Sequence, residues 1–130
     1  KISALSIFFA ALTACQTPDP GITSFSVQSD EKIDRLMPRL VGLAGKCLAG
    51  NGKPFPQYRV SSELNSLSGQ PRILPVRRDD TQGLPGLVIL GQVQGSGTSL
   101  SVFGLLLGVD SPGSAVRNVG AWAAGGKDCA

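Results

Sequence analysis

The chain has 130 residues, a formal net charge of +3 and no histidine. Without histidine, Ser–His and Cys–His nucleophile systems cannot form, and the commonest metal ligand is missing. The basic residues form no long run, so we do not expect nucleic acid as a partner. Composition thus predicts a non-enzyme without cofactor or metal, and the length suits one domain with a modest core.

The first 14 residues have the layout of an export signal. Lys1 precedes the apolar residues 2–12, which two serines interrupt and small residues follow. A positive start, a short apolar run and a small-residue cleavage site are typical of a secretory signal peptide. The run is too short to be a membrane span, which takes ~20 apolar residues. We therefore predict that residues 1–14 are an export signal and not a core helix.

The residues Leu12-Thr13-Ala14-Cys15 make the signal more specific. They resemble the lipobox of bacterial lipoprotein precursors, whereas an ordinary signal would need a small residue where Leu12 stands. The resemblance covers residues 1–15 alone. It implies cleavage after Ala14, acylation of Cys15 and hence the lipid bilayer as a partner. Because Gln16 rather than aspartate follows, it also implies sorting to the inner leaflet of the outer membrane, with the domain facing the periplasm.

A tether and a single domain are expected after the signal. Residues 16–28 contain two prolines, a glycine and several hydroxyl side chains, a composition that favours chain without regular structure. We therefore divide the chain into the signal peptide 1–14, a flexible tether 15–28 that starts at the lipidated Cys15, and a globular domain 29–130.

Residues 29–48 have the periodicity of an amphipathic helix. Apolar residues recur at spacings of three and four, and Ser29 is a suitable N-cap before the acidic Asp30 and Glu31. Pro38 is expected to kink the helix near its middle. The apolar stripe predicts packing on a sheet, with a partner-binding face as the alternative.

The rest of the chain favours strands. Short strands are expected at residues 57–60 and 72–76, the second at a sheet edge because of Pro75. Residues 87–93 and 100–107 predict a hairpin in which Gly95 pairs with Thr98. The predicted fold is therefore α+β: one N-terminal helix packed on a small antiparallel β-sheet, in a single domain.

The predicted hairpin has a second, partly apolar face. Its open end carries Val88, Leu90, Phe103, Leu105 and Leu107. Such a patch needs a cover, either another segment of the chain or a partner. Residues 115–124, which could be a strand or a short helix, are the candidate cover within the chain. If they lie elsewhere, the five residues are a candidate docking surface for an envelope protein.

The two remaining cysteines and one run of charged residues are the other candidates for a bond or a binding site. If Cys15 is lipidated, Cys47 and Cys129 remain, and a pair of cysteines in an exported protein favours a disulfide. A redox or metal-binding pair is the weaker alternative, because there is no C-x-x-C motif. The run Arg77-Arg78-Asp79-Asp80 indicates a solvated turn with local ion pairs rather than a metal or phosphate site.

Two functional classes remain for a chain without catalytic motifs. The first is a membrane-anchored, non-catalytic interaction or structural module of the bacterial cell envelope. The second is a periplasmic lipoprotein that binds a small ligand between helix and sheet. A contiguous exposed apolar patch around Phe103 would favour the first, and a large cavity near Tyr58 or Trp122 would favour the second.

Overall fold

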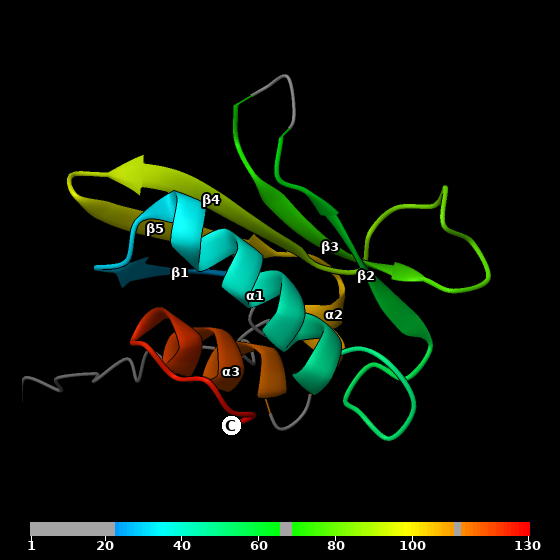
Figure 1. Ribbon diagram of the computed structural model, residues 1–130. Helices are drawn as coiled ribbons and strands as arrows, with labels where there is room; N and C mark the ends of the chain where they lie inside the picture. Colours follow the sequence, from blue (N-terminus) through cyan, green and yellow to red (C-terminus); the bar gives the residue numbers. More distant parts are fainter. Residues whose placement is uncertain (1–22, 66–68, 111–112) are drawn as a thin grey trace, which may run out of the picture.

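A five-stranded antiparallel sheet organises the part of the chain that the computed structural model describes, residues 23–65, 69–110 and 113–130. The elements are β1 (Ser24–Ser29), α1 (Ile33–Cys47), β2 (Tyr58–Glu63), β3 (Arg72–Arg77), β4 (Val88–Gln94), β5 (Gly97–Phe103), α2 (Leu106–Val109) and α3 (Ser114–Ala123). The strand order is β1-β5-β4-β3-β2, and α1 and α3 lie on the same face (Figure 1). The predicted α+β class with an antiparallel sheet is confirmed.

Helix α1 supplies more buried apolar residues to the core than α2 or α3. Its buried residues are Leu36, Met37, Leu40, Leu43, Ala44 and Cys47, and Leu43 alone among them was not a predicted apolar position. The helix begins at Ile33, however, and not at Ser29. Ser29 ends β1, and its hydroxyl accepts a hydrogen bond from the backbone N–H of Glu31 at 3.2 Å. In the described chain, α1 is thus neither the first element nor the only helix.

Strand β1 corrects the predicted tether. Residues 24–28, which we expected to lack regular structure, belong to an edge strand that pairs with β5. Phe25 and Val27 alternate with serine and glutamine, and their half-buried side chains pack against the core. Residues 15–22 of the tether and the whole signal peptide lie outside the described residues. The folded domain therefore begins five residues earlier than predicted.

The hairpin of β4 and β5 has the predicted faces but a different turn. Gln94 pairs with Gly97 around the two-residue turn Gly95-Ser96, whereas we expected Gly95 to pair with Thr98. Each residue of β4 therefore pairs with a residue of β5 two positions earlier than expected. Because side chains alternate with a period of two, this shift leaves the side chains of both strands on their predicted faces. Ile89 and Val102 pair on the inner face, and both are completely buried.

Pro75 lies in an inner strand, so its assignment to a sheet edge was wrong. β3 pairs with β2 along its whole length, but it pairs with β4 only at Arg72 and Ile73. The Pro75 carbonyl accepts a hydrogen bond from the Gly86 N–H at 2.9 Å. Because the N and C=O of a strand residue point the same way, the Pro75 nitrogen also faces this side, where the strands have separated. Its missing N–H therefore breaks no ladder bond.

The chain changes direction after Phe103. We expected the strand to continue to residue 107, but it ends at Phe103, and residues 106–109 form α2. The segment 115–124, which the sequence left open, is helical within α3. The Asp110 carboxylate accepts a hydrogen bond from the Ala115 N–H at 2.7 Å and so caps the start of this helix. α3 packs against β1 and α1, with Trp122 completely buried.

The C-terminal segment 124–130 is held to the helices by side-chain contacts. Arg39 donates hydrogen bonds to the carbonyls of Trp122 and Gly126, each at 2.7 Å. The buried Asn118 side chain accepts a hydrogen bond from the Ala130 N–H at 2.7 Å. The predicted pair Cys47 and Cys129 forms a disulfide in the structure, with Cα atoms 5.3 Å apart.

Candidate interaction surfaces

The structure divides the predicted docking surface. Val88 and Leu107 are buried, the latter in α2 and not in a strand. Leu90 is half-buried, whereas Phe103 and Leu105 remain exposed at 43% and 84% of their surface. The predicted five-residue face therefore does not exist as one exposed patch. Of its members, only Phe103 and Leu105 are exposed.

Helix α3 is not the cover that the sequence offered for this face. Val102 points into the core, so the next residue, Phe103, points from the opposite side of the sheet. α3 buries Val119 and Trp122 in the same cluster as Leu36 and Leu40 of α1. It therefore lies on the inner face and leaves Phe103 uncovered.

Four exposed apolar side chains gather at the end of the molecule that carries α2. In the described chain, the large hydrophobic residues that are exposed are Leu84, Val93, Phe103, Leu105 and Val109. Leu105 and Val109 lie four positions apart on the solvent side of α2, which buries Leu106 and Leu107. We call Leu84, Phe103, Leu105 and Val109 the apolar end.

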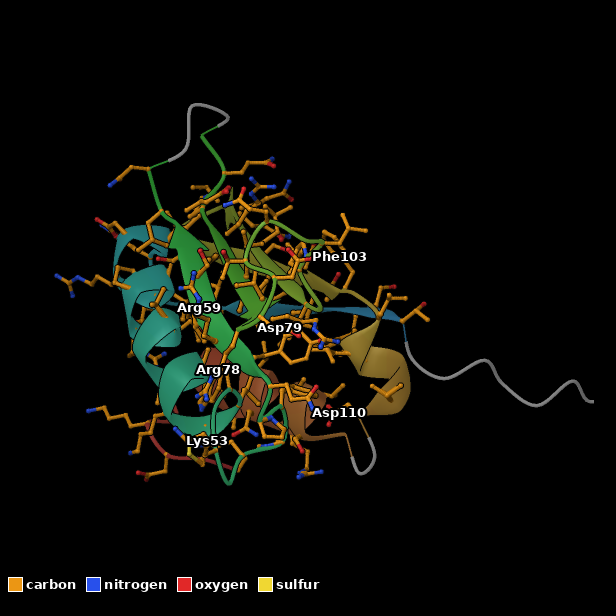
Figure 2. All side chains as sticks on the ribbon, turned by 90° about the vertical axis from the view of Figure 1, so that its right-hand side faces the viewer. Lys53, Arg59, Arg78, Asp79, Phe103 and Asp110 are labelled. Carbon is orange, nitrogen blue, oxygen red and sulfur yellow. A yellow bond between two sulfur atoms is a disulfide. The ribbon has the colours of Figure 1, made fainter. Side chains whose placement is uncertain are left out.

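Backbone hydrogen bonds hold the parts of the apolar end together. The Leu106 N–H donates to the Gly86 carbonyl at 3.0 Å, which places the loop containing Leu84 against the start of α2. Val88 pairs with Phe103 across the two strands that leave this end. Figure 2 looks onto the side of the molecule that carries α2, drawn in gold, with Phe103 and Asp110 labelled.

The first described residues of the chain lie at the same end. Ser24 is the register partner of Phe103, and the Thr23 carbonyl accepts a hydrogen bond from the Gly104 N–H at 3.4 Å. From there β1 runs toward the β4–β5 turn at the other end of the sheet (Figure 1). The polypeptide that leads back to Cys15 therefore joins the domain beside the apolar end.

A groove lies toward the opposite end, next to the β4–β5 turn. Its volume is about 730 Å³, and its walls include Ile33 and Met37 of α1, Gly91 and Val93 of β4, and Leu64. At Gly91, α1 packs closely on β4, because a Cβ atom there would lie 2.8 Å from the Met37 sulfur. Polar side chains on its rim include Asp34, Asn65 and Gln92. This groove is the main concave surface for a second candidate function.

Tyr58 and Trp122, the two aromatic residues next to which a ligand cavity was expected, do not border this groove. Trp122 is completely buried, and its indole N–H donates to the Asp128 carbonyl at 3.0 Å. Tyr58 lines a smaller cavity of about 410 Å³ with Phe55 and Leu106. Its ring contacts Phe55 edge to face, with ring centroids 6.4 Å apart. Trp122 therefore has a structural position in the core.

The charged run 77–80 forms the predicted local ion pair. Two nitrogens of Arg77 lie 2.8 Å from the two carboxylate oxygens of Asp79, and both side chains are exposed. The hydrogen bond with Asp79 raises the pKa of Arg77, and the same bond lowers the pKa of Asp79. Among the described residues, no three acidic or cysteine side chains are grouped so that they could hold a metal ion.

Comparison with known proteins adds no relative from which a role could be transferred. No protein-family model, curated protein or solved structure matches the chain. Within residues 23–65, 69–110 and 113–130, no helix is both long and apolar enough to cross a membrane. A function must therefore be argued from this chain's own sequence and geometry.

Proposed function

We propose that the protein is a lipoprotein of the bacterial cell envelope, anchored in the outer membrane through acylated Cys15, and that its domain is a non-catalytic interaction module facing the periplasm. The observation that carries the proposal is the pattern Leu12-Thr13-Ala14-Cys15 at the end of an apolar run. The structure adds that a folded strand begins at Ser24, soon after that cysteine. Three acyl chains exceed the two membrane signals that stable anchoring requires.

The positions of the acidic residues support a non-catalytic role. Glu31 pairs with Arg39, Glu63 with Arg72 and Asp79 with Arg77, while the Asp110 carboxylate caps α3. These contacts account structurally for four of the nine acidic residues in the chain. Since the chain has no histidine, a general base would have to come from the remaining groups. A domain that only presents surfaces to a partner needs no general base.

A second candidate function is the binding of a small apolar ligand. The groove of about 730 Å³ has apolar walls from two elements, with Ile33 and Met37 on α1 and Val93 on β4. Its volume falls within the usual range for small-molecule sites, ~300–1,000 Å³. Native mass spectrometry of protein extracted from its own membranes discriminates the two functions. A stoichiometric adduct that Val93→Asp removes would favour the ligand-binding role.

The anchor gives the first testable prediction. In a Gram-negative host, Cys15→Ser is expected to abolish lipid attachment, so the protein should leave the outer-membrane fraction and keep the mass of the unprocessed chain. The physical reason is that serine has no thiol to carry the diacylglyceryl group. Sucrose-gradient fractionation with immunoblotting measures the change. The matched control is Ser6→Ala, which keeps the apolar run and should be processed and sorted normally. Retention of Cys15→Ser in the membrane at the normal processed mass would refute the anchor.

A further inference from the structure

We propose that the apolar end, Leu84, Phe103, Leu105 and Val109, rests on the lipid surface that holds Cys15, so that the domain has a fixed orientation on the membrane. The inference deepens the proposed function and depends on it, because the anchor supplies the surface. Its starting point is the distribution of exposed apolar side chains. Four of the five large hydrophobic residues that are exposed in the described chain lie at this end, and Val93 alone lies elsewhere.

The position of the anchor selects a bilayer as the occupant. The Gly104 N–H donates a hydrogen bond to the Thr23 carbonyl, and Ser24 lies opposite Phe103 in the sheet. The chain that leads to Cys15 therefore leaves the domain at the apolar end. Only residues 16–23 separate Cys15 from β1. A segment of this length spans at most about 30 Å even when fully extended. A lipid surface is therefore always within reach of the apolar end.

The same length disfavours the reverse orientation. If the β4–β5 turn faced the bilayer, the point where β1 begins would lie about 20 Å above it, because Ser24 is opposite Phe103, at the far end of β5 from Gly97. The connecting segment would then have to stretch beyond its typical end-to-end distance of about 16 Å, at a cost in conformational entropy. The apolar end faces the bilayer without that cost.

The chemistry of the apolar end suits the boundary between head groups and acyl chains. Leu105 and Val109 project from α2 at 84% and 74% exposure, and Leu84 from its loop at 91%. Burial of such side chains in a membrane interface is favourable and is the usual basis of peripheral binding. The nearby Asp110 carboxylate is engaged at the start of α3, so it accepts a backbone hydrogen bond rather than standing free at this surface. The groove at Ile33 and Val93 then faces away from the membrane.

The test uses the full acylated protein in vesicles of phosphatidylethanolamine and phosphatidylglycerol that contain a phospholipid with a diazirine in its acyl chain. After irradiation, labelled peptides are mapped by mass spectrometry. We expect the peptide containing Leu105 and Val109 to carry at least about tenfold more label than the peptide containing Val93. Leu105→Asp should lower the label on its own peptide by about tenfold. The matched variant Val93→Asp, also at an exposed apolar position, should leave that label unchanged.

Two controls separate the possible failures. Because Leu105 is exposed, Leu105→Asp should melt at the wild-type temperature, so a loss of label cannot be ascribed to unfolding. Flotation of the vesicles reports the anchor independently. Protein that fails to float contradicts the proposed function itself. Protein that floats but has an unlabelled apolar end, whether a second copy, another protein or water covers it, overturns the orientation alone, as does equal labelling at Val93.

Discussion

Replacing both Cys47 and Cys129 by alanine is expected to lower the free energy of unfolding by about 4 kcal/mol. The disulfide joins residues that are 82 positions apart, so it closes most of the folded domain into one loop. Closing a loop of that length removes conformational entropy from the unfolded chain, and the reduced chain regains it. For a domain with a total stability of ~5–15 kcal/mol, the loss is large.

The folded state of this double variant should remain close to that of the wild type. Arg39 still binds the carbonyls of Trp122 and Gly126, and Asn118 still binds Ala130. These contacts hold residues 122–130 without the covalent bond. Urea unfolding followed by circular dichroism measures the change, with Lys127→Ala in the same exposed segment as the control. A loss below about 1 kcal/mol would contradict the assignment of the disulfide as a main source of stability.

Gly104→Ala is expected to lower the free energy of unfolding by about 3 kcal/mol or more. Gly104 has φ +139°, a conformation that residues with a side chain rarely adopt, and a Cβ atom there would lie 2.4 Å from the Gly86 carbonyl oxygen. That oxygen cannot move freely, because it accepts the hydrogen bond from Leu106, and the adjacent Leu87 is completely buried. The clash is therefore with fixed backbone.

Gly108→Ala is the matched control for this substitution. Gly108 lies in the same segment, within α2, and a Cβ atom there would meet no other atom within 4 Å. Alanine should be neutral at this position or stabilise the protein by up to about 1 kcal/mol, because it favours the helix. Thermal and urea unfolding of both variants measure the difference. Equal stability of the two would show that the turn at Gly104 is not constrained as described.

Local patterns in the sequence predicted the elements that local forces decide. The spacing of Leu36, Leu40 and Ala44 predicted the buried side of α1, and the alternation around Ile89 and Val102 predicted the inner face of the hairpin. Both predictions of the buried face held, although the predicted start of the helix and the predicted hairpin turn were wrong. The hairpin turn lies one residue earlier than expected, yet the shift of two register positions kept the side chains of β4 and β5 on their predicted faces.

Non-local pairing explains the element that was missed. Phe25 and Val27 offer only two apolar positions among serines and glutamine, which is a weak strand signal on its own. The strand forms because Val27 pairs with Leu100, far along the chain, and because α3 covers its inner face. Neither partner is visible in the local sequence. The prolines that precede this strand therefore suggested an unstructured tether that extended too far.

The candidate surface was predicted in part. Phe103 and Leu105 are exposed, as a docking surface requires, but the sequence treated Leu105 and Leu107 as strand residues on one face. Gly104 was the available signal, since a glycine within an apolar strand pattern often marks a bend. After the bend, α2 buries Leu107 and exposes Leu105 and Val109. The apolar end lies next to the chain that leads to Cys15 because β1 pairs with β5. Since the sequence did not predict β1, it could not predict this proximity.

The lipid anchor at Cys15 is tested most directly by mass spectrometry of the N-terminal peptide from protein extracted from the envelope of a Gram-negative host. We predict that the mature chain begins at Cys15, with a diacylglyceryl group on the sulfur and a third acyl chain on the amino group. A mature chain that begins at another residue, or that begins at Cys15 with a free thiol, would contradict both the anchor and the membrane orientation that depends on it.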